Sequence, residues 1–470
     1  MSRARFMTML FLLALAVRLP TLYFLRDAYL TGGITTSLGL VARNLLEGRG
    51  LNETTGPDEI LRLYDIQLQD GRLIDIQEFP NPPDQPTSPL IQRMPGYPAL
   101  LALVWKIAGT YRYLPIQLLQ VVLSCLLPLL LYGTARRYFG ETAGRVAGTL
   151  AALNFAEARL AVVPLYDWWI LFTVGVVLWL LALARERGFA LRDFALLGIV
   201  LAVGVYFKST LIIVPFFLAA CLLPQVGFRR SAIGALLLAG LPLLALAPWT
   251  VRNYRVFHRP ILTNTFFWPS MWEGFGEVAN PFGAKLDDRQ TYLAALTEQP
   301  GLHYGSPAYD DFFRAKVIDV YRNSPGFVAS LWIGRLWRGL LFPANPWGIA
   351  GADRPEKSYA SYRMETGGSV LDYVVHRPGV ALVKALQRFW DPVLLFLALL
   401  TLCLHRHRWR EFLPLLAVPL AFLAVTIPIH LEGRYLLPGG LVLILFASVP
   451  VAACIFPSRP GGTSSQDARR

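Results

Sequence analysis

Long apolar runs, interrupted by two polar inserts, limit the possible folds of this sequence more than any other feature. A run of about 20 apolar residues is long enough to cross a bilayer as a helix. Within lipid every backbone amide needs a partner in its own segment, so such runs form helices and not open strands. The expected fold class is therefore an all-α polytopic membrane protein. Ten spans are predicted, at 6–25, 114–134, 146–163, 168–184, 194–208, 210–226, 232–250, 388–404, 411–429 and 436–456.

The composition agrees with this class. Hydrophobic residues make up 54% of the chain and charged residues only 16%, whereas a soluble domain carries roughly a quarter charged residues. The net charge of +13 does not indicate a nucleic acid partner, because the basic residues lie in clusters beside the apolar runs, as cytoplasmic loops do. These clusters are Arg3 and Arg5, Arg136 and Arg137, Arg185 with Arg187 and Arg192, Arg229 and Arg230, and Arg406 with Arg408 and Arg410.

The basic clusters also predict the topology. Ten spans with both termini in the cytoplasm place every cluster inside and both polar inserts outside. The resulting modules are an N-terminal membrane module at 1–250 with a first outer loop at 26–113, an outer insert at 251–387, C-terminal membrane helices at 388–457, and a polar cytoplasmic tail at 458–470 that is expected to be disordered.

Three smaller features bear on this topology. The first segment resembles a secretory signal, but Arg18 interrupts it before any small-residue cleavage site, so an uncleaved anchor is expected. Segment 327–342 carries Arg335 and Arg338 among Trp and Leu residues and is expected to be interfacial or re-entrant. A span there would place the cluster at 406–410 outside. The four cysteines all lie in apolar runs, which favours packing roles over disulfides or a zinc site.

Ionisable residues gather at the outer ends of the predicted spans. Burying a charge near lipid is costly unless the charge serves a site. Arginine matches phosphate oxygens with two parallel hydrogen bonds, and lysine acts as a point charge. A set of cations, carboxylates and aromatic rings on one membrane face therefore suits a lipid phosphate joined to a polar head group. The residues concerned are Arg18, Glu157, Arg159, Asp167, Lys208, Arg252, Arg255, His430, Glu432 and Arg434.

Five motifs occur in register along the chain. They are Ala-Arg-Asn-Leu-Leu-Glu-Gly-Arg-Gly at 42–50, Arg-Met-Pro-Gly-Tyr-Pro at 93–98, Leu-Tyr-Gly-Thr-Ala-Arg-Arg-Tyr-Phe-Gly at 131–140, Pro-Trp-Thr-Val-Arg-Asn-Tyr at 248–254 and Glu-Gly-Arg-Tyr-Leu-Leu-Pro at 432–438. Together they resemble bacterial membrane glycosyltransferases of the GT-C superfamily, including family 39, the dolichyl-phosphate-mannose protein mannosyltransferases and the aminoarabinose transferase of lipid A. Each motif alone is weak, but the resemblance covers essentially the whole chain in order.

The resemblance implies a glycosyltransferase of the bacterial plasma membrane with its active site at the periplasmic face. Such an enzyme takes a sugar from a polyprenyl-phosphate-linked donor and transfers it, typically with inversion, to a lipid, glycan or protein acceptor. The implied partners are this donor, the acceptor and membrane lipids. An acidic residue of the first outer loop is expected to activate the acceptor, and cations are expected to hold the departing phosphate.

The sequence departs from the family at the acidic position. The family places an Asp or an Asp-Glu pair shortly before the arginine that corresponds to Arg43, but residues 33–38 contain no carboxylate. The nearest acid is Asp27, at the outer end of the first span, which is the predicted base. Other carboxylates of the same loop remain alternatives, namely Asp58, Asp65, Asp75 and Asp84.

The remaining site residues follow from the matching motifs. Asp167 corresponds to the acidic residue that opens the fourth span, and it is expected to act as a second carboxylate, an acceptor orienter or an occasional metal ligand. No metal-ligating spacing is present, although a divalent cation is possible. The tandem pair at 287–288 is expected to begin a helix. The predicted phosphate-binding residues are Lys208, Arg252, Arg434 and Arg93, and the predicted pocket-shaping residues are Tyr97, Trp249, Tyr435 and Glu432.

Two other functions fit parts of the sequence. A transporter or flippase of lipid-linked sugars would use the same cations, but transporters commonly contain paired repeats, and the two halves of this chain do not match. A catalytically inactive relative that serves as a partner subunit would explain the missing acid of the first loop.

Overall fold

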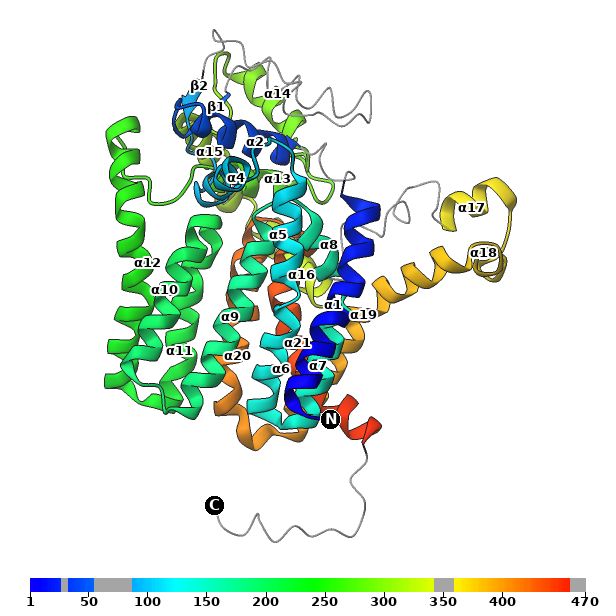
Figure 1. The fold of residues 1–470 in the computed structure, drawn as a ribbon. Helices are drawn as coiled ribbons and strands as arrows, with labels where there is room; N and C mark the ends of the chain where they lie inside the picture. Colours follow the sequence, from blue (N-terminus) through cyan, green and yellow to red (C-terminus); the bar gives the residue numbers. More distant parts are fainter. Residues whose placement is uncertain (27–32, 55–86, 342–358, 457–470) are drawn as a thin grey trace.

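The chain folds as a bundle of helices, seen in a computed structural model that describes residues 1–26, 33–54, 87–341 and 359–456 (Figure 1). The described strands are one short antiparallel pair, β1 (Asn52–Thr54) and β2 (Thr87–Pro89). The predicted all-α polytopic fold is therefore confirmed.

Eight helical segments of the described chain are long and apolar enough to cross a membrane, and each coincides with a predicted span. They are α1 (Arg3–Leu25), α5 (Leu114–Ser124) with α6 (Leu127–Phe139), α9 (Asp167–Glu186), η1 (Ser209–Ile213) with α11 (Val214–Val226), α12 (Phe228–Phe257), α19 (Pro378–Leu404), η3 (Arg406–Arg408) with α20 (Trp409–Ile429), and α21 (Gly433–Ile455). The predicted span at 194–208 is α10 (Leu191–Phe207), a helix of 17 residues.

The segment at 146–163, expected as one span, is instead two helices, α7 (Glu141–Ala152) and α8 (Phe155–Val162). The break has a local cause, because the side chain of Asn154 accepts hydrogen bonds from the first amides of α8 and so caps a new helix. Arg18 satisfies the carbonyl of Ala152 before the break with a 3.1 Å hydrogen bond and lies 4.0 Å from Glu157. Both charged side chains are buried, so this pair lies at the break within the helix bundle.

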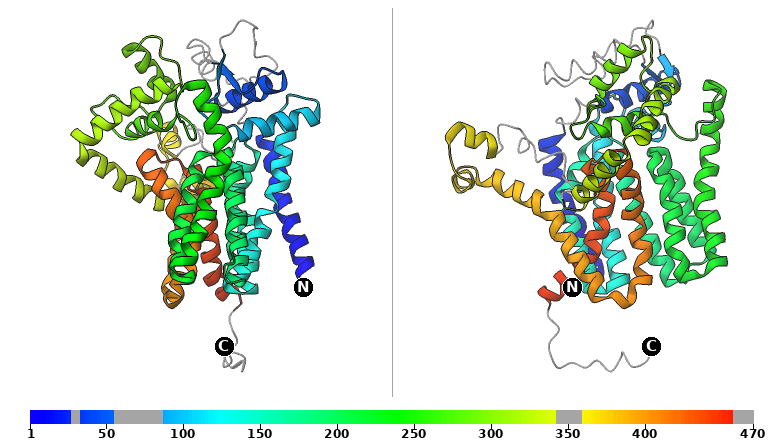
Figure 2. Two further views of the ribbon diagram at one scale, coloured as in Figure 1. Left: turned by 90° about the vertical axis from the view of Figure 1, so that its left-hand side faces the viewer. Right: turned by 180° about the vertical axis from the view of Figure 1, so that it is seen from behind.

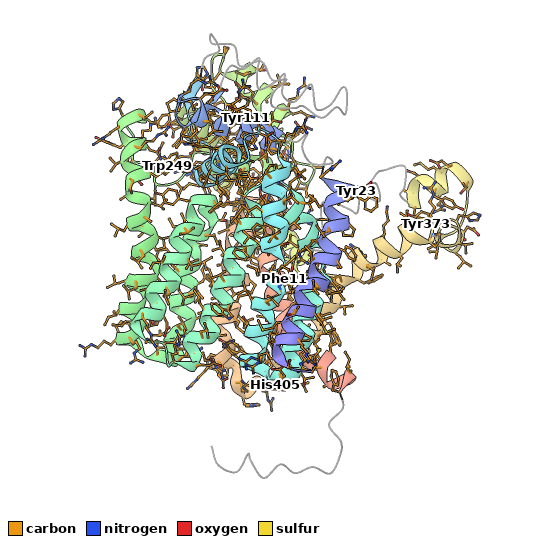
Figure 3. All side chains as sticks on the ribbon, viewed as in Figure 1. Phe11, Tyr23, Tyr111, Trp249, Tyr373 and His405 are labelled. Carbon is orange, nitrogen blue, oxygen red and sulfur yellow. The ribbon has the colours of Figure 1, made fainter. Side chains whose placement is uncertain are left out.

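Both inserts lie at the end of the bundle opposite the start of α1 and the end of α21 (Figures 1 and 2). Trp249 and Tyr111 lie at the end of the bundle that carries the inserts, and His405 lies at the opposite end (Figure 3). The first insert contributes α2 (Gly33–Leu46), β1, β2 and α4 (Gly96–Ala108). Charged and polar groups from distant parts of the sequence are thus collected at one end.

The second insert forms a small helical domain with its own aromatic core. Its helices are α13 (Phe267–Phe275), α14 (Asp288–Glu298), α15 (Pro307–Asn323) and α16 (Pro325–Leu341). The predicted interfacial segment 327–342 falls largely within α16, which is not among the eight candidate spans. Helices α17 (Tyr359–Thr366) and α18 (Val370–His376), with the start of α19, project sideways from the bundle (Figures 1 and 2). The buried rings of the aromatic core include Trp272, Phe275, Tyr292, Tyr304, Tyr309 and Phe313.

Candidate functional site

A cavity of about 610 Å³ lies where the two inserts meet the helices of the bundle. Its lining comes from the end of the first insert, the start of α9, the turn between α10 and η1, the second insert, and the turn between α20 and α21. The ionisable residues that line it are Arg93, Tyr166, Asp167, Lys208, Glu273, Asp287, Asp288, His430, Glu432, Arg434 and Tyr435.

Asp167 joins two cations from separate helices. It is the first residue of α9, where the helix dipole favours a negative charge. Its Oδ1 lies 2.9 Å from Nζ of Lys208, and its Oδ2 lies 3.7 Å from Nη1 of Arg434. The three side chains are 2%, 15% and 9% exposed. Because the geometry is fixed by buried contacts, both positive charges are held in the cavity before any ligand enters.

The turn before α21 completes this cluster. Glu432 forms an ion pair with Arg434, and His430 Nε2 lies 3.2 Å from Glu432 Oε1. Burial alone raises the pKa of Glu432, but hydrogen bonding to His430 and the charge of Arg434 outweigh it and lower this pKa to about 2. Lys208 lies 3.7 Å from the centre of the Tyr435 ring, close enough for a cation–π contact.

The motif at 93–98 contributes Arg93 to the cavity lining. Arg93 and Met94 line the cavity, whereas Tyr97 is buried outside the lining, with its hydroxyl 3.5 Å from Gln120. A Cβ at Gly96 would meet the carbonyl oxygen of Tyr206 at 2.5 Å, so only glycine lets α4 approach α10 this closely. The contact is two residues before Lys208, so this motif helps to position the lysine.

The motif at 248–254 connects elements and does not line the cavity. The indole of Trp249 donates to the carbonyl of Thr263 over 2.6 Å, and Asn253 donates to Ile261 over 2.9 Å. The guanidinium of Arg252 donates to the carbonyl of Leu90 over 2.6 Å and lies 4.9 Å from the centre of the Trp249 ring. The structure thus places the predicted phosphate-binding Arg252 and the predicted pocket residue Trp249 where they tie the two inserts to α12.

Three carboxyl groups of the second insert line the cavity, and they were not among the predicted site residues. Glu273 lies in α13, while Asp287 caps α14, as predicted for this pair, and Asp288 begins that helix. An ionisable residue inside the run Trp-Glu-Gly-Phe-Gly at 272–276 was the available signal, since a carboxylate among aromatic residues needs a reason to be there. We refer to Glu273, Asp287 and Asp288 as the insert carboxyls.

A buried arginine fixes α13, the helix that carries Glu273, against the bundle. Arg335 of α16 is fully buried and donates to the carbonyls of Gly274, at 2.6 Å, and Ile427, at 2.7 Å. It also pairs with Glu277, which accepts a 2.6 Å hydrogen bond from the amide of Leu431. Since Gly274 and Leu431 belong to different elements, this one network docks α13 onto the turn that carries the cavity cations.

The remaining predicted acids lie outside the described residues. These are Asp27, the predicted base, and the four alternatives Asp58, Asp65, Asp75 and Asp84. Among the residues that the structure describes, no group of three or more His, Cys, Asp or Glu side chains is arranged to hold a metal ion. The possible divalent cation therefore has no set of ligands in this part of the chain.

The cavity holds cations on one set of elements and carboxyl groups on another, above apolar helices. This arrangement suits an anionic lipid head group that meets a second, polar molecule. The fold and the site together define a polytopic membrane protein with a charged site at the end of its bundle that carries the inserts.

Comparisons with known proteins agree with this class. Residues 85–251 match the family described as dolichyl-phosphate-mannose-protein mannosyltransferase; this segment contains Arg93, Asp167 and Lys208. The oligosaccharyltransferase of Archaeoglobus fulgidus in its apo form is similar in fold, with a TM-score of 0.51 and 13% identity, over 96% of this chain and 50% of that chain. The predicted resemblance to GT-C glycosyltransferases is therefore confirmed.

A second solved structure gives the same result. It is the oligosaccharyltransferase AglB of Archaeoglobus fulgidus in complex with an inhibitory peptide and a dolichol-phosphate, with a TM-score of 0.50 and 13% identity, over 97% of this chain and 52% of that chain. The chain thus spans about half the length of these solved structures. At 13% identity, the likeness is one of fold. No curated protein matches the chain in sequence.

Proposed function

We propose that the protein is a membrane glycosyltransferase that moves a sugar from a polyprenyl-phosphate-linked donor to a lipid, glycan or protein acceptor. The reaction takes place at the periplasmic face of a bacterial plasma membrane, with both termini in the cytoplasm. The observation that carries the proposal is the convergence of Arg93, Lys208 and Arg434 on one cavity. Three cations from distant parts of the sequence match a phosphate that becomes more negative as the sugar leaves.

The apolar part of the cavity supports a lipid-linked donor. Apolar side chains from α9, η1 and α20 also line the cavity, and an isoprenoid chain needs such a surface. These residues are Ile170, Ile212, Ile213, Phe422, Val425 and Ile429.

The proposed reaction is a single displacement that inverts the anomeric carbon. The acceptor atom attacks this carbon, and the bond to the phosphate oxygen breaks with its electron pair remaining on the phosphate. Lys208 and Arg434 stabilise the dianionic polyprenyl phosphate that forms, and Asp167 keeps both cations in place. The apolar surroundings strengthen these charge interactions relative to water.

The test is reconstitution of the purified protein in liposomes with synthetic polyprenyl-phosphate hexoses and a short alkyl glycoside as acceptor. We expect release of polyprenyl phosphate together with a glycosylated acceptor. Sugar that crosses the bilayer while still attached to its lipid would instead support a flippase. Binding of polyprenyl phosphate with neither transfer nor crossing would support an inactive partner subunit.

A further inference from the structure

The insert carboxyls have features that the donor phosphate does not explain. They line the same cavity as the cations but come from α13 and from the start of α14. Carboxylates repel a phosphate, so this part of the cavity is unsuited to the donor head group. It is suited to a ligand that donates hydrogen bonds.

Glu273 is the central group of this region. Its residue is only 5% exposed, and its Oε1 has no hydrogen-bond partner within the protein. A buried polar atom without a partner destabilises the fold. Because Glu273 lines the cavity, a molecule bound there is able to supply the missing donor.

The backbone around Glu273 holds this carboxyl in place. A Cβ at Gly274 would lie 1.9 Å from the carbonyl oxygen of Ile429, and a Cβ at Gly276 would lie 2.3 Å from the carbonyl carbon of Lys285. The first contact presses α13 against the end of α20. The second folds the following loop back, which brings Asp288 beside Glu273.

Glu273 and Asp288 form a carboxyl pair. Both side chains line the cavity, and burial, followed by the charge of Asp288, raises the pKa of Glu273 well above its ordinary value. The charges of Glu432 and Asp287 act in the same direction. The negative charge of one carboxylate raises the proton affinity of its neighbour. When both groups are ionised, the pair is therefore a stronger base for its first proton than an isolated carboxylate is.

We propose that Glu273 and Asp288 form the acceptor subsite, that the acceptor attacks through a hydroxyl group, and that this carboxyl pair receives the hydroxyl proton. The inference rests on the proposed transfer reaction and adds the acceptor class and the base. The oxygen of the hydroxyl bonds to the anomeric carbon as the bond to phosphate breaks. Its proton goes to the pair, and the electron pair of the broken bond stays on the phosphate held by Lys208 and Arg434. Acceptors that attack through a phosphate are excluded by the insert carboxyls.

The test uses the full-length protein in liposomes with polyprenyl-phosphate hexoses as donors. Glu273→Gln keeps the shape and hydrogen-bonding capacity of the side chain but does not accept a proton. We expect transfer to an alkyl glycoside to fall at least about 100-fold, with an unchanged Tm and an affinity for polyprenyl phosphate within about threefold of wild type. An alkyl phosphate should not act as an acceptor.

The matched control is Glu298→Gln, which lies on α14 at a largely exposed position paired with Lys316. It should transfer sugar like the wild type. Asp288→Asn supplies a second, independent readout, because removing a neighbouring negative charge lowers the pKa of Glu273. The acidic limb of the pH–rate profile should therefore move to lower pH in this variant. This readout decides the matter if Glu273→Gln lowers the Tm.

Each contrary outcome has a separate meaning. If Glu273→Gln transfers sugar at the wild-type rate, the carboxyl pair is not the base. The same follows if the acidic limb of the pH–rate profile does not move in Asp288→Asn. Either result leaves the proposed glycosyltransferase function intact. Efficient transfer to the alkyl phosphate overturns the acceptor class. A wild-type protein that binds polyprenyl phosphate and never transfers sugar overturns the proposed function, and this inference with it.

Discussion

Each end of the bundle carries a cluster in which one carboxylate pairs with two cations beside a tyrosine ring. At the inserts these residues are Asp167, Lys208, Arg434 and Tyr435 of the cavity cluster, to which Glu432 adds a second carboxylate. At the opposite end the terminal cluster consists of Tyr138, Arg185, Arg408 and Glu411. In each, the carboxylate bridges both cations, and a tyrosine ring lies under Arg185 in the terminal cluster and under both Lys208 and Arg434 in the cavity cluster. Composition alone therefore does not distinguish a site from a structural ion-pair network.

Burial and cavity access distinguish the two clusters. The charged side chains of the terminal cluster are 26–36% exposed, and Arg408 donates to the carbonyl of Tyr138 over 3.1 Å. In the cavity cluster, Asp167, Lys208 and Arg434 are 2–15% exposed and line the cavity. Exposed pairs contribute little to stability and bind ions weakly because water screens them. Cations held in a partly dry cavity interact much more strongly with a ligand charge.

The largest difference should come from removing one cation at each end. We expect Lys208→Ala to lower sugar transfer about 100- to 1,000-fold, because a fixed positive charge no longer stabilises the departing phosphate. Arg185→Ala should leave transfer within about twofold of wild type, because an exposed ion pair contributes little. Turnover and polyprenyl phosphate affinity, measured side by side in liposomes, test this contrast. Equal losses in both variants would mean that the two clusters do not differ as described.

Removing the bridging carboxylates should give a smaller difference. Asp167→Asn is expected to lower transfer about 10- to 100-fold, because Lys208 loses the partner that holds its position. Affinity for polyprenyl phosphate should not fall, since the cavity becomes more positive. Glu411→Gln, the matched change at the other end, should retain transfer. A loss of phosphate affinity in Asp167→Asn at an unchanged Tm would show that Asp167 does more than position the cations.

The helix bundle and much of the cavity cluster could be predicted from the sequence, because both depend on local chemistry. Apolar length predicts a span, and charges at span ends predicted Asp167, Lys208, Arg434 and Glu432, which the fold brings together. The break before α8 was missed because it depends on Asn154 and on Arg18 from a distant helix. Glu273 was missed for a similar reason, since its place beside the cations depends on the docking of α13 onto α20.

Arg252 provides a test of an intermediate case, a cation near the inserts that is outside the cavity lining. Its guanidinium binds the carbonyl of Leu90, and hydrogen bonds of charged groups contribute about 1.5–3 kcal/mol. We expect Arg252→Ala to lower the Tm by a few degrees and to change transfer less than Lys208→Ala does. The opposite pattern, an unchanged Tm with lost polyprenyl phosphate affinity, would return Arg252 to the phosphate-binding role predicted from its motif.

The smallest expected effect is a change in how the stability of the fold depends on pH. It involves Glu432, in the turn that carries Arg434. Because the pKa of Glu432 is held at about 2 in the folded protein, against an ordinary value of 4.5, its ionised form stabilises the fold above pH 4.5. This contribution is lost as the pH falls toward about 2.

We expect Glu432→Gln to lower the Tm modestly at pH 7, because Arg434 loses its partner. The difference in Tm between this variant and the wild type should narrow steadily below pH 4.5. Glu298→Gln, which removes a carboxylate of α14 that is paired with Lys316, is the matched control. A Tm difference of equal size at pH 7 and pH 3 would mean that Glu432 acts through packing and not through its charge, and the cavity cations would then depend on Asp167 alone for their negative partner.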